Sequence, residues 1–192
     1  MRRLLPVLLV VATCTGDLSA QAIRRLPGFQ RNSIPANDDG SSELVQLPFT
    51  LNFFGRFRGS AFVNNNGNIT FDESLSTFTP FGLVRTQREI IAPFFADLDT
   101  RSPLSSLVYY GEDTVDGRKA FGVNYFTVGY FANHGDLLNT FQVILIDRSD
   151  TGAGNFDVEF NYERIQWETG DASGGAGGRG GTPVVIGWSN GS

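Results

Sequence analysis

The chain has 192 residues, and its 15 basic residues against 20 acidic ones give a formal net charge of −5 at pH 7. An acidic surface argues against nucleic acid and anionic membranes as partners, because both repel negative charge. The single cysteine, Cys14, lies near the N-terminus, so the rest of the chain has no thiol for catalysis, for a disulfide or for zinc.

Residues 1–22 have the features of a secretory signal peptide. Arg2 and Arg3 form a basic start, residues 4–12 are largely apolar, and Ala20-Gln21-Ala22 has the small-x-small form of a signal-peptidase site. The apolar run is shorter than the roughly 20 residues that a membrane-spanning helix requires. A lipoprotein signal acylated at Cys14 is the alternative. Both interpretations predict a secreted or surface-displayed protein, without membrane insertion after cleavage.

Residues 23–43 are polar and contain the turn formers Pro27, Pro35 and Gly40, which predicts a loosely ordered lead-in. From residue 44 to 192, short apolar or alternating runs are separated by turn residues. Only the stretch 74–78 suggests a short helical turn. This pattern predicts an all-β, mainly antiparallel single domain that resembles a β-sandwich, with long loops and little helix. The expected strands are 45–54, 61–64, 68–72, 90–95, 107–112, 119–128, 140–147, 156–162 and 184–188.

Several connections have sequences typical of specific turns. Asn66-Gly67 and Asp116-Gly117 predict hairpins, because both turn positions there need a positive φ. Residues 156–162 alternate strictly between apolar and polar side chains, as in a strand with one buried face. Residues 170–181 are rich in glycine and bury little apolar surface, which predicts a mobile loop.

Several of these runs also resemble the blocks of one known family, in the same order along the chain. The matching stretches are residues 47–55 (LPFTLNFFG), 61–71 (AFVNNNGNITF), 90–100 (IIAPFFADLDT), 139–145 (NTFQVIL) and 165–175 (IQWETGDASGG). This ordered set resembles the nidogen-type extracellular (NIDO) domain family over most of residues 44–190. The resemblance implies an extracellular role in matrix contact or cell–matrix adhesion, and it supplies no catalytic residues to carry over. A departure is Phe95, which stands where the family often has tryptophan.

Asp97 and Asp99 are the charged pair of greatest chemical interest. In an extended segment, positions two apart face the same side, so both carboxylates would converge on one point. Carboxylate oxygens at that spacing suit Ca²⁺, with the Thr100 hydroxyl or a carbonyl assisting. The interpretation that we favour is that both side chains accept hydrogen bonds from backbone amides where the strand ends. No cofactor is therefore predicted, and Ca²⁺ is the alternative.

Aromatic and polar residues near the C-terminal end supply the remaining candidates. Trp167 and Trp188 could form a platform for a sugar, although a buried tryptophan that anchors two sheets is common in sandwiches. Asp171, in the glycine-rich segment, joins Trp167 and the two aspartates above as a candidate binding residue. Asn68 and Asn190 begin glycosylation sequons, which count only if the source is eukaryotic.

Carboxylates elsewhere do not form a convincing catalytic pair. A glycosidase would need two carboxylates facing one another across a cleft, but Asp157 and Glu159 lie on the polar face of a strand, where charges are needed for solubility. His134 lies in a loop, and no serine has the context of a nucleophile elbow. The sequence therefore predicts a non-enzymatic extracellular binding module for a matrix or cell-surface protein. A carbohydrate-binding domain, with calcium assisting, is the alternative, and an exported glycan hydrolase comes last.

Overall fold

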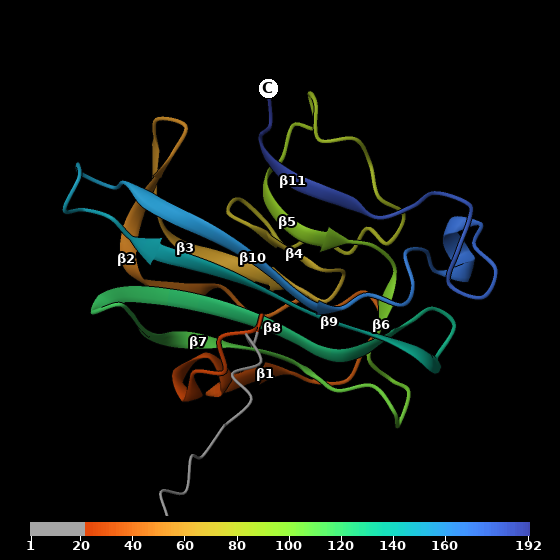
Figure 1. Cartoon of the computed structure of the whole chain (residues 1–192). Coiled ribbons are helices and arrows are strands. Elements are labelled where there is room, and N and C mark those ends of the chain that lie inside the picture. The colour runs from red at the N-terminus through yellow and green to blue at the C-terminus, as the bar shows by residue number, and fades with distance from the viewer. Residues whose placement is uncertain (1–21) are drawn as a thin grey trace, which may run out of the picture.

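The computed structural model describes residues 22–192. The predicted signal peptide, apart from its last residue Ala22, and Cys14 therefore lie outside the described residues. Two antiparallel sheets pack face to face in this part of the chain (Figure 1). This arrangement confirms the prediction of an all-β, sandwich-like domain. Between residues 22 and 192, no helix has the length and apolar character that crossing a membrane requires.

The six-stranded sheet has the order β1-β7-β8-β9-β10, with the short β6 paired to β8. Its strands are β1 (Asn32–Ile34), β6 (Leu98–Asp99), β7 (Val108–Val115), β8 (Arg118–Tyr130), β9 (His134–Asp147) and β10 (Phe156–Arg164). The five-stranded sheet has the order β11-β5-β4-β3-β2. Its strands are β2 (Val45–Phe53), β3 (Arg56–Asn64), β4 (Asn68–Thr70), β5 (Glu89–Phe95) and β11 (Val185–Asn190).

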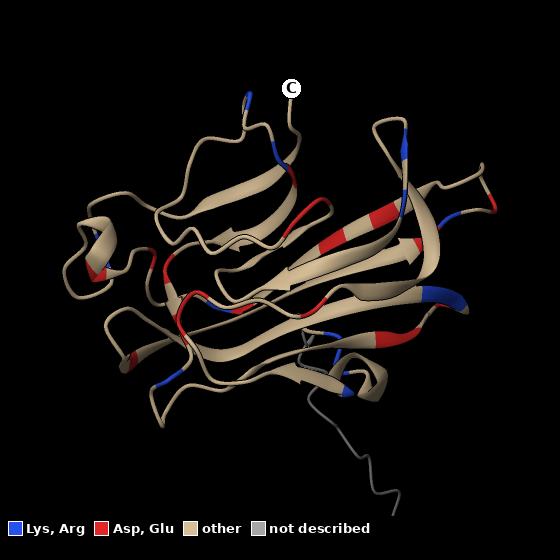
Figure 2. Cartoon of the chain, turned by 180° about the vertical axis from the view of Figure 1, so that it is seen from behind, with Lys and Arg blue, Asp and Glu red and all other residues tan. Residues whose placement is uncertain are grey.

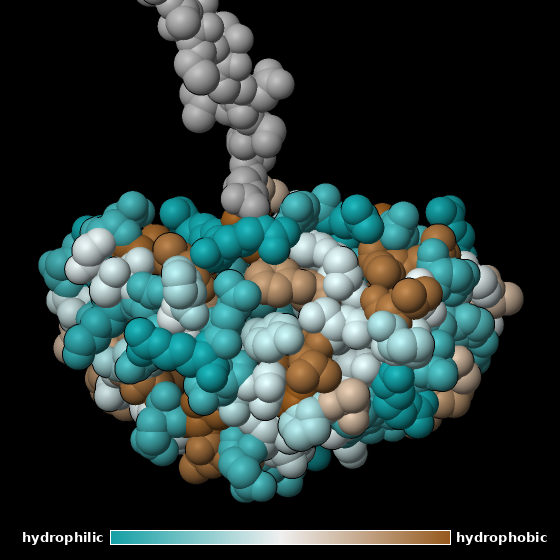
Figure 3. All heavy atoms as spheres, turned by 90° about the horizontal axis from the view of Figure 1, so that it is seen from below, coloured by the Kyte–Doolittle hydropathy of each residue, from teal (hydrophilic) through white to brown (hydrophobic). Residues whose placement is uncertain are grey.

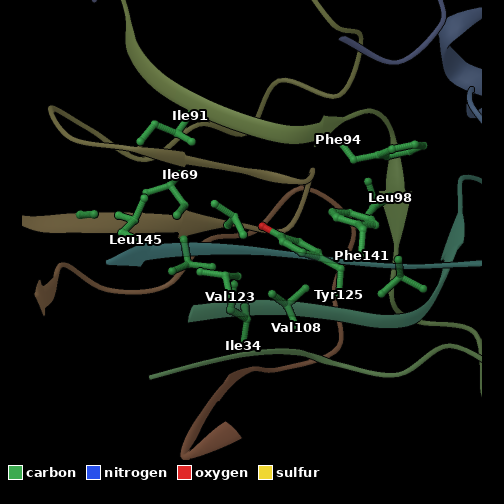
Figure 4. Close-up of a cluster of buried hydrophobic side chains, with 14 of the residues drawn as sticks. Ile34, Ile69, Ile91, Phe94, Leu98, Val108, Val123, Tyr125, Phe141 and Leu145 are labelled. Carbon is green, nitrogen blue, oxygen red and sulfur yellow. The ribbon is translucent and has the colours of Figure 1, made fainter. Parts of the chain in front are cut away.

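The core lies between the two sheets and is lined by their inward-facing side chains (Figure 4). Tyr125 of β8 stacks on Phe141 of β9, with ring centroids 4.5 Å apart. Its hydroxyl donates a 2.9 Å hydrogen bond across the core to the Asn64 carbonyl of β3. Each large apolar side chain buried here stabilises the fold by roughly 1.5–3 kcal/mol, and the buried hydroxyl does not offset this gain because it has a partner.

β5 is buried along its whole length, because side chains cover both of its faces. Ile91 and Phe94 point into the core between the sheets. On the opposite face, Ile90 and Phe95 pack against Leu75 and the loop that precedes β5. A strand covered on both sides is expected to be apolar without alternation, which is how residues 90–95 read in the sequence.

The two predicted hairpin turns differ in geometry. Val115 pairs with Arg118, and Asp116 and Gly117 between them have φ of 50° and 76°, as expected for a two-residue turn. In the other hairpin Asn64 pairs with Asn68, which leaves a three-residue loop in which only Gly67 has a positive φ, of 74°. The expectation of two positive φ angles was therefore wrong at Asn66, since a longer loop places the left-handed residue last.

Two segments that the sequence predicts to be loosely ordered are built into the fold. Within residues 23–43, the short 3-10 helix η1 (Pro27–Gln30) lies on β7 and β8 and buries Phe29 there, and β1 pairs with β7. Within residues 170–181, the 3-10 helix η2 (Asp171–Ser173) is followed by turns in which the Gly178 carbonyl accepts hydrogen bonds from the backbone of Glu168 and Thr169. Among the described residues these are the helical turns, whereas residues 74–78 have no regular structure.

Seen from below, over η1, β1 and β7, the surface is largely hydrophilic, and its apolar residues form separate patches (Figure 3). This face therefore does not offer one continuous apolar surface to a partner.

Candidate functional site

Four segments that are far apart in the sequence meet at one end of the sandwich. They are the loop of residues 37–40, the stretch 96–100 that contains β6, the turn between β8 and β9, and the loop that carries η2. Hydrogen bonds connect them: Thr100 N donates to the Asn37 carbonyl at 2.9 Å, and Phe131 N to the Asp97 carbonyl at 3.1 Å. Figure 2, which shows the chain from behind, places several acidic segments at this end.

Asp97 is an almost completely buried carboxylate at this end of the sandwich. Its relative exposure is 1 %, and its Oδ2 has no hydrogen-bond partner among residues 22–192. Burial, together with the nearby carboxyl groups of Asp38 and Asp39, raises the pKa of Asp97 to about 7. A buried polar atom without a partner is costly, so this carboxyl group is a candidate for function.

Asp38 and Asp39 complete the cluster, because one carboxylate oxygen from each lies within 4.8 Å of the others and of one from Asp97. Asp38 Oδ2 contacts the Arg101 guanidinium at 3.1 Å, but its Oδ1 is buried and unpartnered within the described part of the chain. Burial and the neighbouring aspartates raise the pKa of Asp38 to about 6. Asp39 Oδ1 accepts a 2.8 Å hydrogen bond from the Asn66 side chain.

The asparagines of the β3–β4 hairpin hold this cluster together. Asn65 Nδ2 donates to the carbonyl of Asp38 and, at 2.9 Å, to the carbonyl of Leu98. Asn66 Oδ1 accepts a 2.9 Å hydrogen bond from Leu98 N, while its Nδ2 reaches Asp39. Both side chains are fully buried. A single hairpin loop thereby fixes the acidic loop 37–40 beside the aspartates of residues 97–99.

Asp99 has other partners than Asp97, although the sequence predicts that the two carboxylates converge. Its oxygens accept hydrogen bonds from Arg101 Nε at 2.9 Å and from the backbone nitrogens of Arg101 and Asn133 at 3.0 and 2.7 Å. Burial alone would raise the pKa of Asp99, but the hydrogen bonds from Arg101 and Asn133 outweigh it and hold the pKa below its ordinary value. Asp99 is therefore committed to Arg101 and to the backbone of the β8–β9 turn.

The other candidates separate into buried and exposed residues. Trp167 is 1 % exposed, and its indole N–H donates a 3.0 Å hydrogen bond to the Val128 carbonyl, so it packs in the core and is closed to a sugar. Trp188 is 56 % exposed. Asp171 is half-exposed and lies 3.0 Å from Nε2 of His134, which stacks on a tyrosine ring.

The sequons differ in accessibility. Asn68 is fully buried, and its side-chain amide donates a hydrogen bond to the Asn66 carbonyl. A glycan therefore could not be attached to Asn68 in the folded domain. Asn190 remains partly exposed near the C-terminus. The two β10 carboxylates weighed for catalysis are engaged by arginines: Asp157 lies 2.8 Å from Arg148, and Glu159 lies 2.8 Å from Arg24.

A second candidate surface is an apolar groove of about 620 Å³ between the edge strands β10 and β11 and the end of β2. The residues that define this aromatic groove are Phe53, Phe54, Ile91, Phe156, Val158 and Trp188. Phe54 is 61 % exposed, at a φ of 52° in the turn between β2 and β3. Sequence reasoning treated Phe54 as a strand residue and so did not single it out.

Comparison with known proteins finds one matching family model and similar segments within much longer proteins. Residues 19–190 match the family model described as "NIDO related". Alpha-tectorin of Mus musculus is 35 % identical over 164 residues, covering 73 % of this chain and 7 % of that protein. Nidogen of Drosophila melanogaster is 26 % identical over 162 residues, covering 71 % of this chain and 12 % of that protein. The chain thus spans a small fraction of these relatives, and no solved structure matches it significantly.

Proposed function

Since the chain belongs to the NIDO-related family, we propose that it is an extracellular, matrix-type binding module. In this proposal it holds a partner protein in its aromatic groove. The extracellular location is supported by the family and by the signal-like N-terminal sequence. The groove supports the mode of binding, because large exposed apolar surfaces rimmed by polar residues mark interaction sites.

The observation that carries the proposal is the position of Phe54. Phe53 pairs with Arg56, so Phe54 and Gly55 form a two-residue turn with φ of 52° and 92°. Such turns favour asparagine and glycine, and a bulky residue at positive φ is strained by on the order of 1–2 kcal/mol. In return, the turn projects the Phe54 ring into solvent beside the groove. A strained, exposed aromatic residue is better explained by binding than by stability.

The groove is suited to an extended peptide segment with apolar side chains. β10 and β11 are the outermost strands of their sheets, so each presents unpaired backbone groups along the groove. Aromatic side chains such as Trp188 and Phe54 supply the anchoring contacts that dominate protein interfaces. A peptide strand could therefore gain both backbone hydrogen bonds and apolar burial at this surface.

Catalysis is not part of the proposal. Asp157 and Glu159, the carboxylates weighed for a glycosidase, form ion pairs with arginines. Asp97 and Asp99 lie outside the groove. A matrix-binding role requires none of them to react.

The test uses a Phe54→Asn variant, since asparagine suits the turn conformation and the fold should be kept or stabilised. Binding of the purified protein to an array of extracellular matrix proteins should fall at least tenfold in Phe54→Asn and in Trp188→Ser. Val84→Ser is the matched control, because Val84 is apolar and 83 % exposed but lies outside the groove. Equal binding by all variants would contradict the groove, and binding to glycans in place of proteins would favour a carbohydrate-binding domain.

A further inference from the structure

The acidic cluster of Asp38, Asp39 and Asp97 lacks enough hydrogen-bond donors for its oxygens. Arg101 contacts Asp38 Oδ2, but its closest hydrogen bonds go to Asp99. Asp38 Oδ1 and Asp97 Oδ2 are buried and have no partner within residues 22–192. Three carboxylates this close repel one another, and the repulsion is strongest where burial lowers the local dielectric constant. Either protons or a cation must compensate the charge.

Asp97 in particular is held in this position by the packing of its neighbours. Its side chain is 1 % exposed, and its backbone carbonyl accepts a hydrogen bond from Phe131 N. Gly170 passes so close that a Cβ at that position would lie 2.5 Å from Asp97 Oδ2. The unpartnered oxygen therefore lies against the backbone of Gly170, where a rotamer change cannot easily expose it to water.

The chemistry of the cluster points to a hard cation. Its ligand atoms are all carboxylate oxygens, and Ca²⁺ is the divalent ion that prefers oxygen ligands in irregular loop sites. With Ca²⁺–oxygen distances of about 2.3–2.6 Å, two ligands on opposite sides of the ion are about 5 Å apart. The carboxylate oxygens lie within 4.8 Å of one another, so one Ca²⁺ can contact all three. Mg²⁺ demands near-ideal octahedral geometry and usually keeps several of its waters, which a buried site of carboxylates suits poorly.

We propose that Asp38, Asp39 and Asp97 form a Ca²⁺ site that ties the N-terminal loop 37–40 to the link between β5 and β6. This ligand set differs from the sequence expectation, because Asp99 is committed to Arg101 and Asn133. The ion would join two distant parts of the chain at the end of the sandwich. The site does not involve the aromatic groove, so it stands or falls independently of the proposed docking function.

The decisive experiment is calcium titration of the purified protein by isothermal calorimetry, with thermal unfolding in EDTA and in millimolar CaCl₂. We expect one Ca²⁺ per chain, a dissociation constant on the order of 0.1–1 mM as in extracellular modules, and a rise in Tm of a few degrees. Asp97→Asn should fold, because it removes a buried charge, and should lose both the heat signal and the Tm rise. Asp39→Asn should weaken binding at least tenfold.

The control is Asp116→Asn, which removes the same charge from an exposed turn whose positive φ asparagine tolerates. It should bind Ca²⁺ as the unchanged protein does. Absence of binding, or binding that persists in Asp97→Asn, would overturn the site. An equal response to MgCl₂ would overturn its assignment to Ca²⁺.

Discussion

Raising the pH in EDTA should destabilise this protein, because of the acidic cluster. The pKa of Asp97 is raised to about 7 and that of Asp38 to about 6, both above the ordinary aspartate value of 3.8. Between about pH 4 and pH 7 the native state therefore holds protons that the unfolded chain has released. Stability is fully present below the unfolded pKa and is lost as pH rises through the folded pKa values.

The size of the effect follows from the shift at Asp97. One pKa unit corresponds to about 1.4 kcal/mol, so a shift of about three units sets an upper limit near 4 kcal/mol. Asp38 and Asp39 are partly exposed, and solvent there screens part of the repulsion. The contribution of Asp38 reflects the same repulsion and is not added. We expect the free energy of unfolding to fall by on the order of 2 kcal/mol between pH 5 and pH 8.

The assay is urea unfolding at pH 5, 6, 7 and 8 in EDTA, for the unchanged chain and for Asp97→Asn. The variant should show a much shallower pH dependence and should be more stable than the unchanged chain at pH 8. Calcium at about 5 mM and pH 8 should restore roughly 1–2 kcal/mol of the lost stability, in the unchanged chain only. The reasoning would be refuted if Asp97→Asn followed the same pH profile, or if it were the less stable protein at pH 8.

Three further substitutions test the packing that supports the two surfaces, each by urea unfolding. Gly67→Ala should cost at least about 3 kcal/mol, because its φ is 74° and a Cβ would lie 1.8 Å from a carbonyl of β5; a cost below 1 kcal/mol would contradict this. Trp167→Phe should cost about 2–4 kcal/mol, since it removes the indole hydrogen bond to the Val128 carbonyl and leaves a void in the core; intact stability would refute the core role. Arg58→Met should cost about 3 kcal/mol, because the Glu89 side chain, 2 % exposed, loses a 2.6 Å ion pair. Arg56 also lies 3.1 Å from Glu89, and a neutral effect would show that this second ion pair suffices.

The strands of the sandwich could largely be predicted from the sequence because their signals are local. Alternation along residues 156–162 and the unbroken apolar run at 90–95 both report burial directly. β1 and η1 escaped prediction for the opposite reason. Within residues 23–43 the buried side chains Ile23, Phe29 and Ile34 are widely separated, so no window of the sequence shows a period. β6, only two residues long, is defined by its pairing with β8.

The acidic cluster could be predicted only in part, because its geometry depends on contacts between distant segments. The alternation rule singled out Asp97 and Asp99 together, but it could not show that Arg101 and the Asn133 backbone engage Asp99. Asp38 lies in a polar stretch that carries no sign of its neighbours. Its position follows from the buried amide of Asn65, which the sequence presents only as part of a turn.

The placement of β1 and β11 in different sheets has a mechanical consequence. Each is an edge strand, β1 at the bottom of the six-stranded sheet and β11 at the top of the five-stranded sheet (Figure 1). Tension applied between the two ends of the described chain would therefore enter one sheet and leave through the other. The load would cross the aromatic layer between the sheets, and the N-terminal segment with η1 and β1 would detach first, before that layer gave way.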